Sequence, residues 1–142
     1  MNGTKSFKFI VLSMLFFTAC TFPGGSEFTG KTYTAILSGV NQIPKNTSMG
    51  KGKVTMTLSA DEKTASVTYF AEKLEGNPVN TYVLGPAKEE ETTTKVIYPI
   101  NNKTIGVTTI DPDELLALRS GLVYVNVYTS KYPGGELRGQ LK

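Results

Sequence analysis

The chain has 142 residues, enough for one domain of ordinary size and too few for two. Hydrophobic residues make up 39% and charged residues 19%, which excludes a disordered chain and a coiled coil. The 15 basic and 12 acidic residues give a net charge of +3, without the clustered basic patch of a nucleic-acid-binding domain. There is no His and a single Cys, which excludes Ser–His and Cys–His catalysis, His-based metal sites and an internal disulfide. We therefore expect no enzymatic activity, no cofactor, no metal and no nucleic-acid partner.

The N-terminal segment, residues 1–19, is predicted to be a secretory signal. Lys5 and Lys8 supply positive charge, and residues 9–19 (FIVLSMLFFTA) form an apolar run shorter than the ~20 residues that span a bilayer. The run ends in FTAC, where small residues directly before Cys20 resemble the lipobox of bacterial lipoproteins, although lipoboxes prefer Leu where this tetrapeptide has Phe. In such proteins the Cys is acylated and becomes the first residue of the mature chain. An ordinary secretory signal and an uncleaved N-terminal anchor are the two alternatives.

Lipidation of Cys20 would set the organisation of the rest of the chain. Residues 20–30, rich in Gly, Ser and Thr, are predicted to be a flexible tether, and residues 31–142 a single folded domain. Two or three acyl chains anchor a protein stably in a membrane. This predicts a location in the bacterial cell envelope, facing the periplasm or the cell surface. Thr21 stands where enteric bacteria use Asp to retain lipoproteins in the inner membrane, so the outer membrane is favoured.

Eight short segments of the domain show the period-two alternation, or the enrichment in β-branched and aromatic residues, that is typical of β-strands. In chain order they are residues 33–38, 54–58, 65–71, 79–84, 95–100, 104–110, 122–128 and 136–141. The strongest is LVYVNVY at 122–128, which places three Val on one face and Tyr124, Asn126 and Tyr128 on the other. This pattern predicts an all-β fold, an antiparallel β-sandwich of the immunoglobulin-like or Greek-key type.

One short helix is expected near residues 111–120. Asp111 fits the N-cap, Pro112 the first helical position, and Glu114 the third position, as in a capping box. Gly121 fits the position just after a helix. The helix start therefore explains the three acidic residues Asp111, Asp113 and Glu114 without a calcium site.

Three motifs of the domain resemble the chordin-type (CHRD) domain, which occurs in chordin and in many bacterial secreted proteins. They are residues 33–44 (YTAILSGVNQIP), residues 81–87 (TYVLGPA) and residues 118–141, which contain LRSG, YVNVYT and PGGELRGQL. The corresponding family sequences are A-x-L-S-G-x-x-x-x-P, A-H-I-H-G-P-A, L-x-S-G-x-x-Y-V-N-V-H-T and P-x-G-E-I-R-G-Q-L. The resemblance covers residues 31–142 and implies the family's β-sandwich.

The His residues of the family motifs are replaced in this chain. Their positions fall on Tyr82, Leu84 and Tyr128. Three His from two strands would form a metal or polar site loosely similar to that of copper–zinc superoxide dismutase. A phenol with a pKa of about 10 is a poor metal ligand at neutral pH, and a Leu is none. We expect these three residues to lie close together as a packed cluster.

The sequence therefore predicts a non-catalytic cell-envelope lipoprotein whose CHRD-like domain binds or scaffolds an envelope or extracellular protein or glycan. The alternative is a surface adhesin that uses Tyr124, Asn126 and Tyr128 as its binding face, since Tyr serves equally in interfaces and in strand packing. A superoxide-dismutase-like metalloprotein is a remote alternative, disfavoured by the absence of His. Glu136 and Arg138, two residues apart on the last strand, are expected to join a structural ion-pair network.

Overall fold

The computed structural model describes residues 28–142. The predicted signal peptide, Cys20 and most of the predicted tether lie outside the described residues. Within residues 28–142, no helix is both long enough and apolar enough to cross a membrane.

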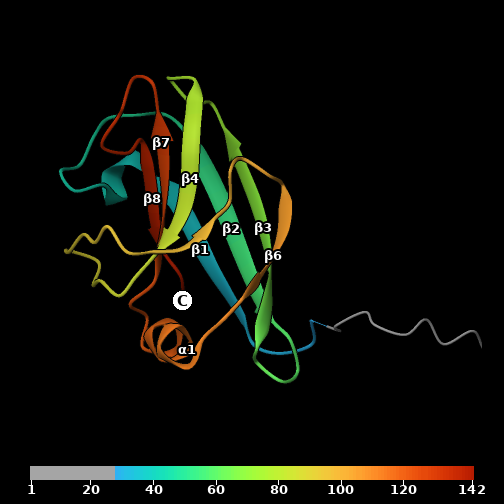
Figure 1. Ribbon diagram of the computed structural model, residues 1–142. Helices are drawn as coiled ribbons and strands as arrows, with labels where there is room; N and C mark the ends of the chain where they lie inside the picture. Colours follow the sequence, from blue (N-terminus) through green and yellow to red (C-terminus); the bar gives the residue numbers. More distant parts are fainter. Residues whose placement is uncertain (1–27) are drawn as a thin grey trace, which may run out of the picture.

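Eight strands and one α-helix form the domain (Figure 1). The strands are β1 (Thr32–Ser38), β2 (Lys51–Leu58), β3 (Thr64–Glu72), β4 (Pro78–Leu84), β5 (Val96–Pro99), β6 (Ile105–Thr109), β7 (Tyr124–Thr129) and β8 (Leu137–Gln140). The helix is α1 (Pro112–Arg119), and a 3-10 turn, η1 (Gly39–Asn41), follows β1. All eight predicted strands are confirmed. The seventh begins two residues later than predicted, because the Leu122 amide donates to the carbonyl of Ala117 and completes the helix end.

The predicted capping of the helix is confirmed. The Glu114 amide donates to Asp111 Oδ1 at 2.8 Å, and the Asp111 amide donates to Glu114 Oε2 at 3.0 Å. Pro112 occupies the first helical position, where its missing N–H is not needed. Gly121, just beyond the helix, has a φ of +69°, which a residue with a side chain adopts at a cost.

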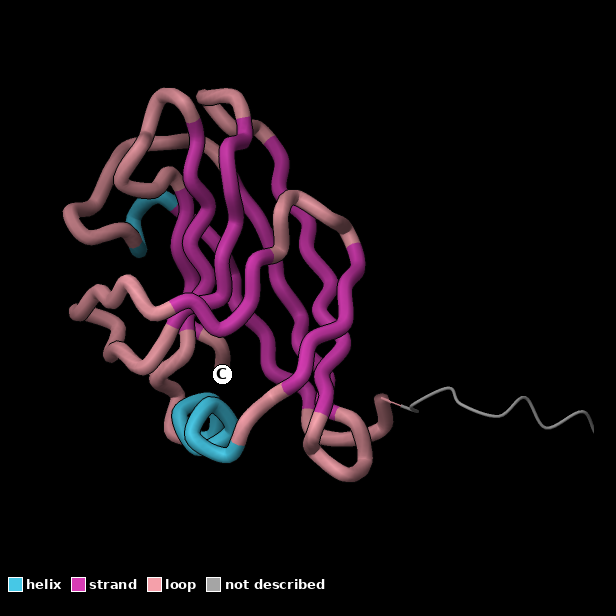
Figure 2. Tube along the Cα trace, in the orientation of Figure 1, coloured by secondary structure: helices cyan, strands magenta, loops and turns pink. Residues whose placement is uncertain are grey.

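The strands form one antiparallel sheet in the order β5-β4-β7-β8-β1-β2-β3-β6, which confirms the predicted all-β antiparallel fold. The two four-stranded halves fold over one another as the layers of a sandwich do, but they remain one continuous sheet that is nearly closed (Figure 2). The halves join where β8 meets β1, through the pair Ser38–Arg138 and two backbone bonds between Thr34 and Lys142. At the opposite side, the Tyr98 hydroxyl of β5 packs directly over Gly106 of β6, where a side chain would clash.

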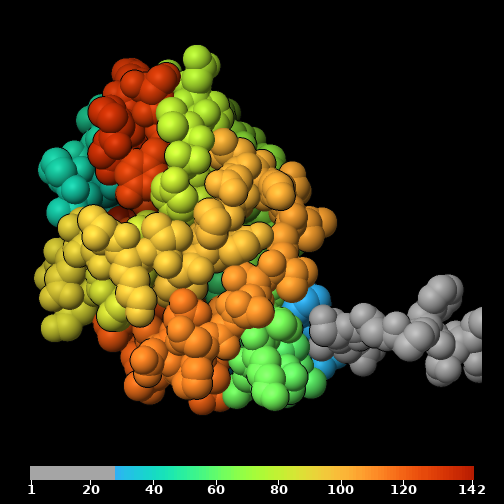
Figure 3. Space-filling model, viewed as in Figure 1, coloured from blue at the N-terminus to red at the C-terminus, as the bar shows by residue number. Residues whose placement is uncertain are grey.

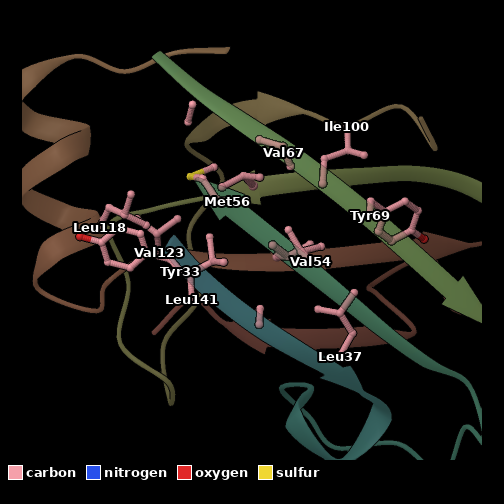
Figure 4. Close-up of a cluster of buried hydrophobic side chains, with 14 of the residues drawn as sticks. Tyr33, Leu37, Val54, Met56, Val67, Tyr69, Ile100, Leu118, Val123 and Leu141 are labelled. Atoms are coloured by element: carbon pink, nitrogen blue, oxygen red, sulfur yellow. The ribbon is translucent and has the colours of Figure 1, made fainter. Parts of the chain in front are cut away.

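The hydrophobic core lies between the two halves of the sheet, and α1 closes one end of it (Figures 1 and 4). Leu37, Val54, Met56 and Val67 enter it from one half, and Val83, Val125, Val127, Leu137 and Leu141 from the other; all are buried. Leu118 of α1 covers the end near Tyr33 and Val123 (Figure 4). Because side chains alternate along a strand, the residues between these core positions point to the outer faces of the sheet.

Candidate functional site

The outer face of four neighbouring strands, β4, β7, β8 and β1, carries polar and aromatic side chains instead of core residues. Strand pairing aligns Tyr82, Asn126, Arg138 and Ser38 in one row across these strands. Two long loops, residues 39–50 and 85–95, project from this side of the sheet (Figures 1 and 2). We call this outer face, together with both loops, the loop-covered face.

Arg138 is buried at the centre of the loop-covered face, with 2% of its surface exposed. Its guanidinium lies over the ring of Tyr124, 3.8 Å from the ring centroid. Its Nη2 donates to the carbonyls of Lys88, at 3.0 Å, and Glu91, at 2.7 Å. Arg138 therefore holds the 85–95 loop against the sheet, by hydrogen bonds to the backbone and by a cation–π contact with the strand below.

Glu136 is fully buried and holds a different set of loops. Its two carboxylate oxygens accept hydrogen bonds from the hydroxyls of Ser48 and Thr129, at 2.6 and 2.7 Å, and from the amides of Glu75 and Gly76, at 2.7 and 3.3 Å. Burial raises the pKa of this carboxyl, but the hydrogen bonds favour the charged form and hold the pKa of Glu136 below its ordinary value.

The predicted ion-pair network of Glu136 and Arg138 is wrong. Within residues 28–142, neither side chain forms an ion pair. Glu136 precedes β8 and its carboxylate meets Thr129, whereas Arg138 lies within β8 and stacks over Tyr124. Each charge therefore reaches a different loop: Glu136 binds the backbone and hydroxyls near Ser48 and Glu75, and Arg138 binds the backbone of the 85–95 loop.

Three amides fasten the 39–50 loop to the sheet. Asn46 Nδ2 donates to the carbonyl of Glu136 at 3.0 Å, Asn41 Nδ2 donates to that of Arg138 at 3.2 Å, and Gln42 Nε2 donates to Asn126 Oδ1 at 2.5 Å. Sequence reasoning missed these residues as parts of a site. Amides in loops are normally exposed, so no local pattern marks Gln42 as buried.

The three positions of the family's His residues lie together on this face. The rings of Tyr82 and Tyr128 meet edge to face, with centroids 5.8 Å apart. Leu84 forms a small buried cluster with Ala87 and Tyr124, and Tyr82 packs against that cluster. Burial raises the pKa of Tyr128, so its phenol stays neutral at physiological pH. In the part of the chain that the structure describes, no three His, Cys, Asp or Glu residues are grouped so that they could hold a metal ion.

The predicted binding face of Tyr124, Asn126 and Tyr128 is not an open aromatic surface. Tyr124 is 1% exposed, and its hydroxyl donates to the carbonyl of Thr93 at 3.1 Å and accepts from the Thr93 amide at 3.2 Å. Asn126 is also buried and is bonded to Gln42. The three residues instead line a cleft of about 530 Å³ between the two loops.

A larger cleft of about 670 Å³ lies beside the first, over β1 and β8. Arg138 and Gln140 of β8 line it, and an apolar wall comes from β1 and the 39–50 loop. The other charged residues of its lining are Lys45, Glu89, Glu90 and Lys142. In the space-filling view, the 39–50 loop (teal) and the 85–95 loop (yellow) lie next to one another at one side of the domain (Figure 3). The loop-covered face thus offers buried hydrogen-bonding groups beside apolar surface, an arrangement that is typical of ligand sites.

Comparison with known families agrees with the motifs and the fold. The model of the CHRD domain matches residues 33–141, which runs from β1 to the end of β8. No curated protein and no solved structure matches the chain. The family match covers most of the 142 residues, and the loop-covered face lies entirely within it. The chain therefore belongs to the CHRD domain family.

Proposed function

We propose that this protein is a non-catalytic, lipid-anchored binding module of the bacterial cell envelope, and that the clefts of the loop-covered face bind an envelope or extracellular partner. The observation that carries the proposal is the burial of Glu136 and Arg138. Each of these charged side chains forms hydrogen bonds to the backbone of a loop. Burying a charge costs more stability than packing an apolar residue of similar size. The arrangement is therefore better explained by the need to position the two loops than by folding alone.

The path of β1 supports a binding role at a distance from the membrane. The described chain begins beside Leu58, where the Gly30 amide donates to the Leu58 carbonyl, at the end of the domain that α1 covers (Figure 1). The seven residues of β1 then run to η1, a length of about 23 Å. An anchor at Cys20 would hold the domain by its lower end in Figure 1 and leave the 39–50 loop at the far end of β1. The outer membrane is the favoured location, because Thr21 follows Cys20.

Site-specific photo-crosslinking in intact cells tests the proposal. A photoreactive amino acid is placed in the full chain at Val40, which lines the larger cleft and is 62% exposed, or at Ile105 on β6, which is 66% exposed. The two positions are matched in exposure and differ in location. We expect discrete crosslinked products from Val40 that are missing from Ile105. Equal products from both positions, or products from Ile105 alone, would place binding elsewhere.

The side of the membrane that the domain faces is a separate part of the proposal. Protease treatment of intact cells cleaves a domain exposed at the cell surface, as an adhesin would be, and leaves a periplasmic domain intact. Tyr124 and Asn126 are buried and Tyr128 is half-buried, which supports binding in the clefts over binding by an open aromatic face.

A further inference from the structure

Arg138 is a buried cation whose charge has no carboxylate partner within residues 28–142. Its protein hydrogen bonds all come from Nη2, which leaves the N–H groups of Nε and Nη1 unused among the described residues. Within residues 28–142, the fully enclosed side-chain atoms that lack a partner are the Tyr33 hydroxyl and Gln140 Oε1. Nε and Nη1 of Arg138 are not among these enclosed atoms, and Arg138 lines the larger cleft.

The surroundings of Arg138 hold it in place without an ion pair, and Glu89, the acidic group that acts on its charge, is itself paired with Lys142. The Tyr124 ring lies under the guanidinium, and the neighbours of Arg138 on the adjoining strands, Asn126 and Ser38, are uncharged. Burial lowers the pKa of the guanidinium, as expected for a cation removed from water without full compensation. A guanidinium fixed by stacking and by two backbone carbonyls loses little further conformational freedom when an anion binds.

The rest of the larger cleft limits which anions fit. Ile36, Val40 and Ile43 supply an apolar wall, and the first two are 64% and 62% exposed, so the wall is open to a ligand. Glu89 and Glu90 line the cleft together with Lys45 and Lys142, and Lys142 is paired with Glu89. With Arg138 included, three positive and two negative side chains leave one net positive charge, which a single negative charge balances. A singly charged group on an apolar body matches both features, whereas a dianion such as phosphate does not.

We propose that the larger cleft binds a monoanionic carboxylate with an apolar body. The carboxylate accepts hydrogen bonds from the Nε and Nη1 groups of Arg138, and the apolar part packs against Ile36, Val40 and Ile43. The inference rests on the proposed function, since it names the ligand class of the loop-covered face. The carboxylate can belong to the C-terminal residue of a peptide or to a small organic acid, and two probes separate these sources.

Saturation-transfer NMR on the detergent-solubilised full chain tests the inference, with protein-free micelles as the blank. The probes are N-acetylleucine, which mimics a peptide C-terminus, and hexanoate, each compared with its neutral amide. We expect at least one acid to bind about tenfold more tightly than its amide, and inorganic phosphate to leave that binding unchanged. Preference for N-acetylleucine would identify a peptide source, and preference for hexanoate a small acid. Equal binding of acid and amide, or no binding of either acid, would overturn the inference.

Two matched variants assign the binding to the cleft without disturbing the buried Arg138. Val40→Asp adds a negative charge to the cleft wall, and Ile105→Asp makes the same change at an equally exposed position on β6. We expect Val40→Asp to weaken binding of the acid about fivefold or more, by charge repulsion, and Ile105→Asp to leave it unchanged. Equal effects of the two variants would contradict the assignment. If Val40 gives crosslinked products in cells but the acids bind no better than their amides, the proposed function stands and only this ligand class is rejected.

Discussion

Glu136, directly before β8, and Arg138, within β8, are buried residues of opposite charge that do not pair with each other. Period-two alternation predicts that both side chains share one face, and this prediction is wrong. The Glu136 carboxylate meets Thr129, which follows the core residues of β7, whereas Arg138 lies over Tyr124 on the outer face. The sequence does not predict their loop partners either, because residues 48, 75–76 and 88–91 are far away along the chain. For Tyr82, Leu84 and Tyr128 the alternation along each strand does give the shared face, but not the loops that enclose it.

The Glu136→Gln variant tests the role of the buried carboxylate. An amide cannot accept hydrogen bonds at both ends, so two of the four donors would face an NH₂ group. We expect a loss of about 2–3 kcal/mol in the free energy of unfolding, measured by urea denaturation. Glu72→Gln, at an exposed position on β3, changes the net charge equally and should have little effect. Similar losses for the two variants would show that the hydrogen bonds of Glu136 contribute nothing specific.

The pH dependence of stability follows from the same carboxyl. The folded-state pKa of Glu136 is lower than its unfolded value, so its contribution is complete above the unfolded pKa of about 4.3 and disappears as the pH falls through the folded pKa. We expect the stability difference between wild type and Glu136→Gln to shrink on acidification below about pH 4. A difference that stays constant down to pH 2 would contradict the depressed pKa.

At the scale of elements, signals that lie within a few residues predict structure well. The capping residues around Asp111 predicted the helix, and alternation predicted all eight strands. The order of strands in the sheet depends on pairing between distant segments and could not be predicted in this way. The last strand in the sequence, β8, lies between β7 and β1 at the junction of the two halves.

The helix cap gives a quantitative test at this scale. Asp111→Ala removes the side chain that accepts from the Glu114 amide and should cost about 1 kcal/mol of stability. Asp113→Ala removes a charge from the same first turn without removing the cap, and should cost no more than about 0.5 kcal/mol. Thermal unfolding of the two variants checks the difference, and equal shifts would mean that only charge matters there.

Deletion of residues 136–142 tests the place of β8 in the fold. The deletion would separate β7 from β1 and remove Leu137 and Leu141, both fully buried, whose burial is worth about 3–6 kcal/mol. We expect an unfolded or aggregating protein in a thermal unfolding experiment. A truncated chain that melts within about two degrees of the parent would show that β8 is peripheral.

At the scale of the whole molecule, the sequence predicted an all-β domain and its family, but not the near closure of a single sheet. Closure depends on contacts such as Tyr98 over Gly106, which join the two edge strands. The loop-covered face also depends on contacts between distant parts of the chain. The 39–50 and 85–95 loops come together only when β8 lies beside β1. The sequence motifs contain most residues of the candidate site. They do not predict that two loops enclose these residues in clefts.

The proposed lipid anchor also concerns the whole molecule. Cys20→Ser should abolish acylation and move the protein from the detergent phase to the aqueous phase in a phase-partition assay, since the thiol is the acyl acceptor in lipoproteins. Thr21→Ser, one residue further on, is the matched control and should stay in the detergent phase. If Cys20→Ser partitions like wild type, the apolar segment is an uncleaved anchor.

Hydrogen–deuterium exchange of the full chain, compared between native envelopes and purified detergent micelles, tests most directly whether the loop-covered face is the binding surface. A partner present only in the envelopes should slow exchange in residues 39–50 and 85–95, because it covers their exposed backbone, and should leave β6 unchanged. Slower exchange confined to these two loops is the result that we predict. Equal exchange of the loops in both preparations, or protection of β6 instead, would contradict the assignment of the binding surface.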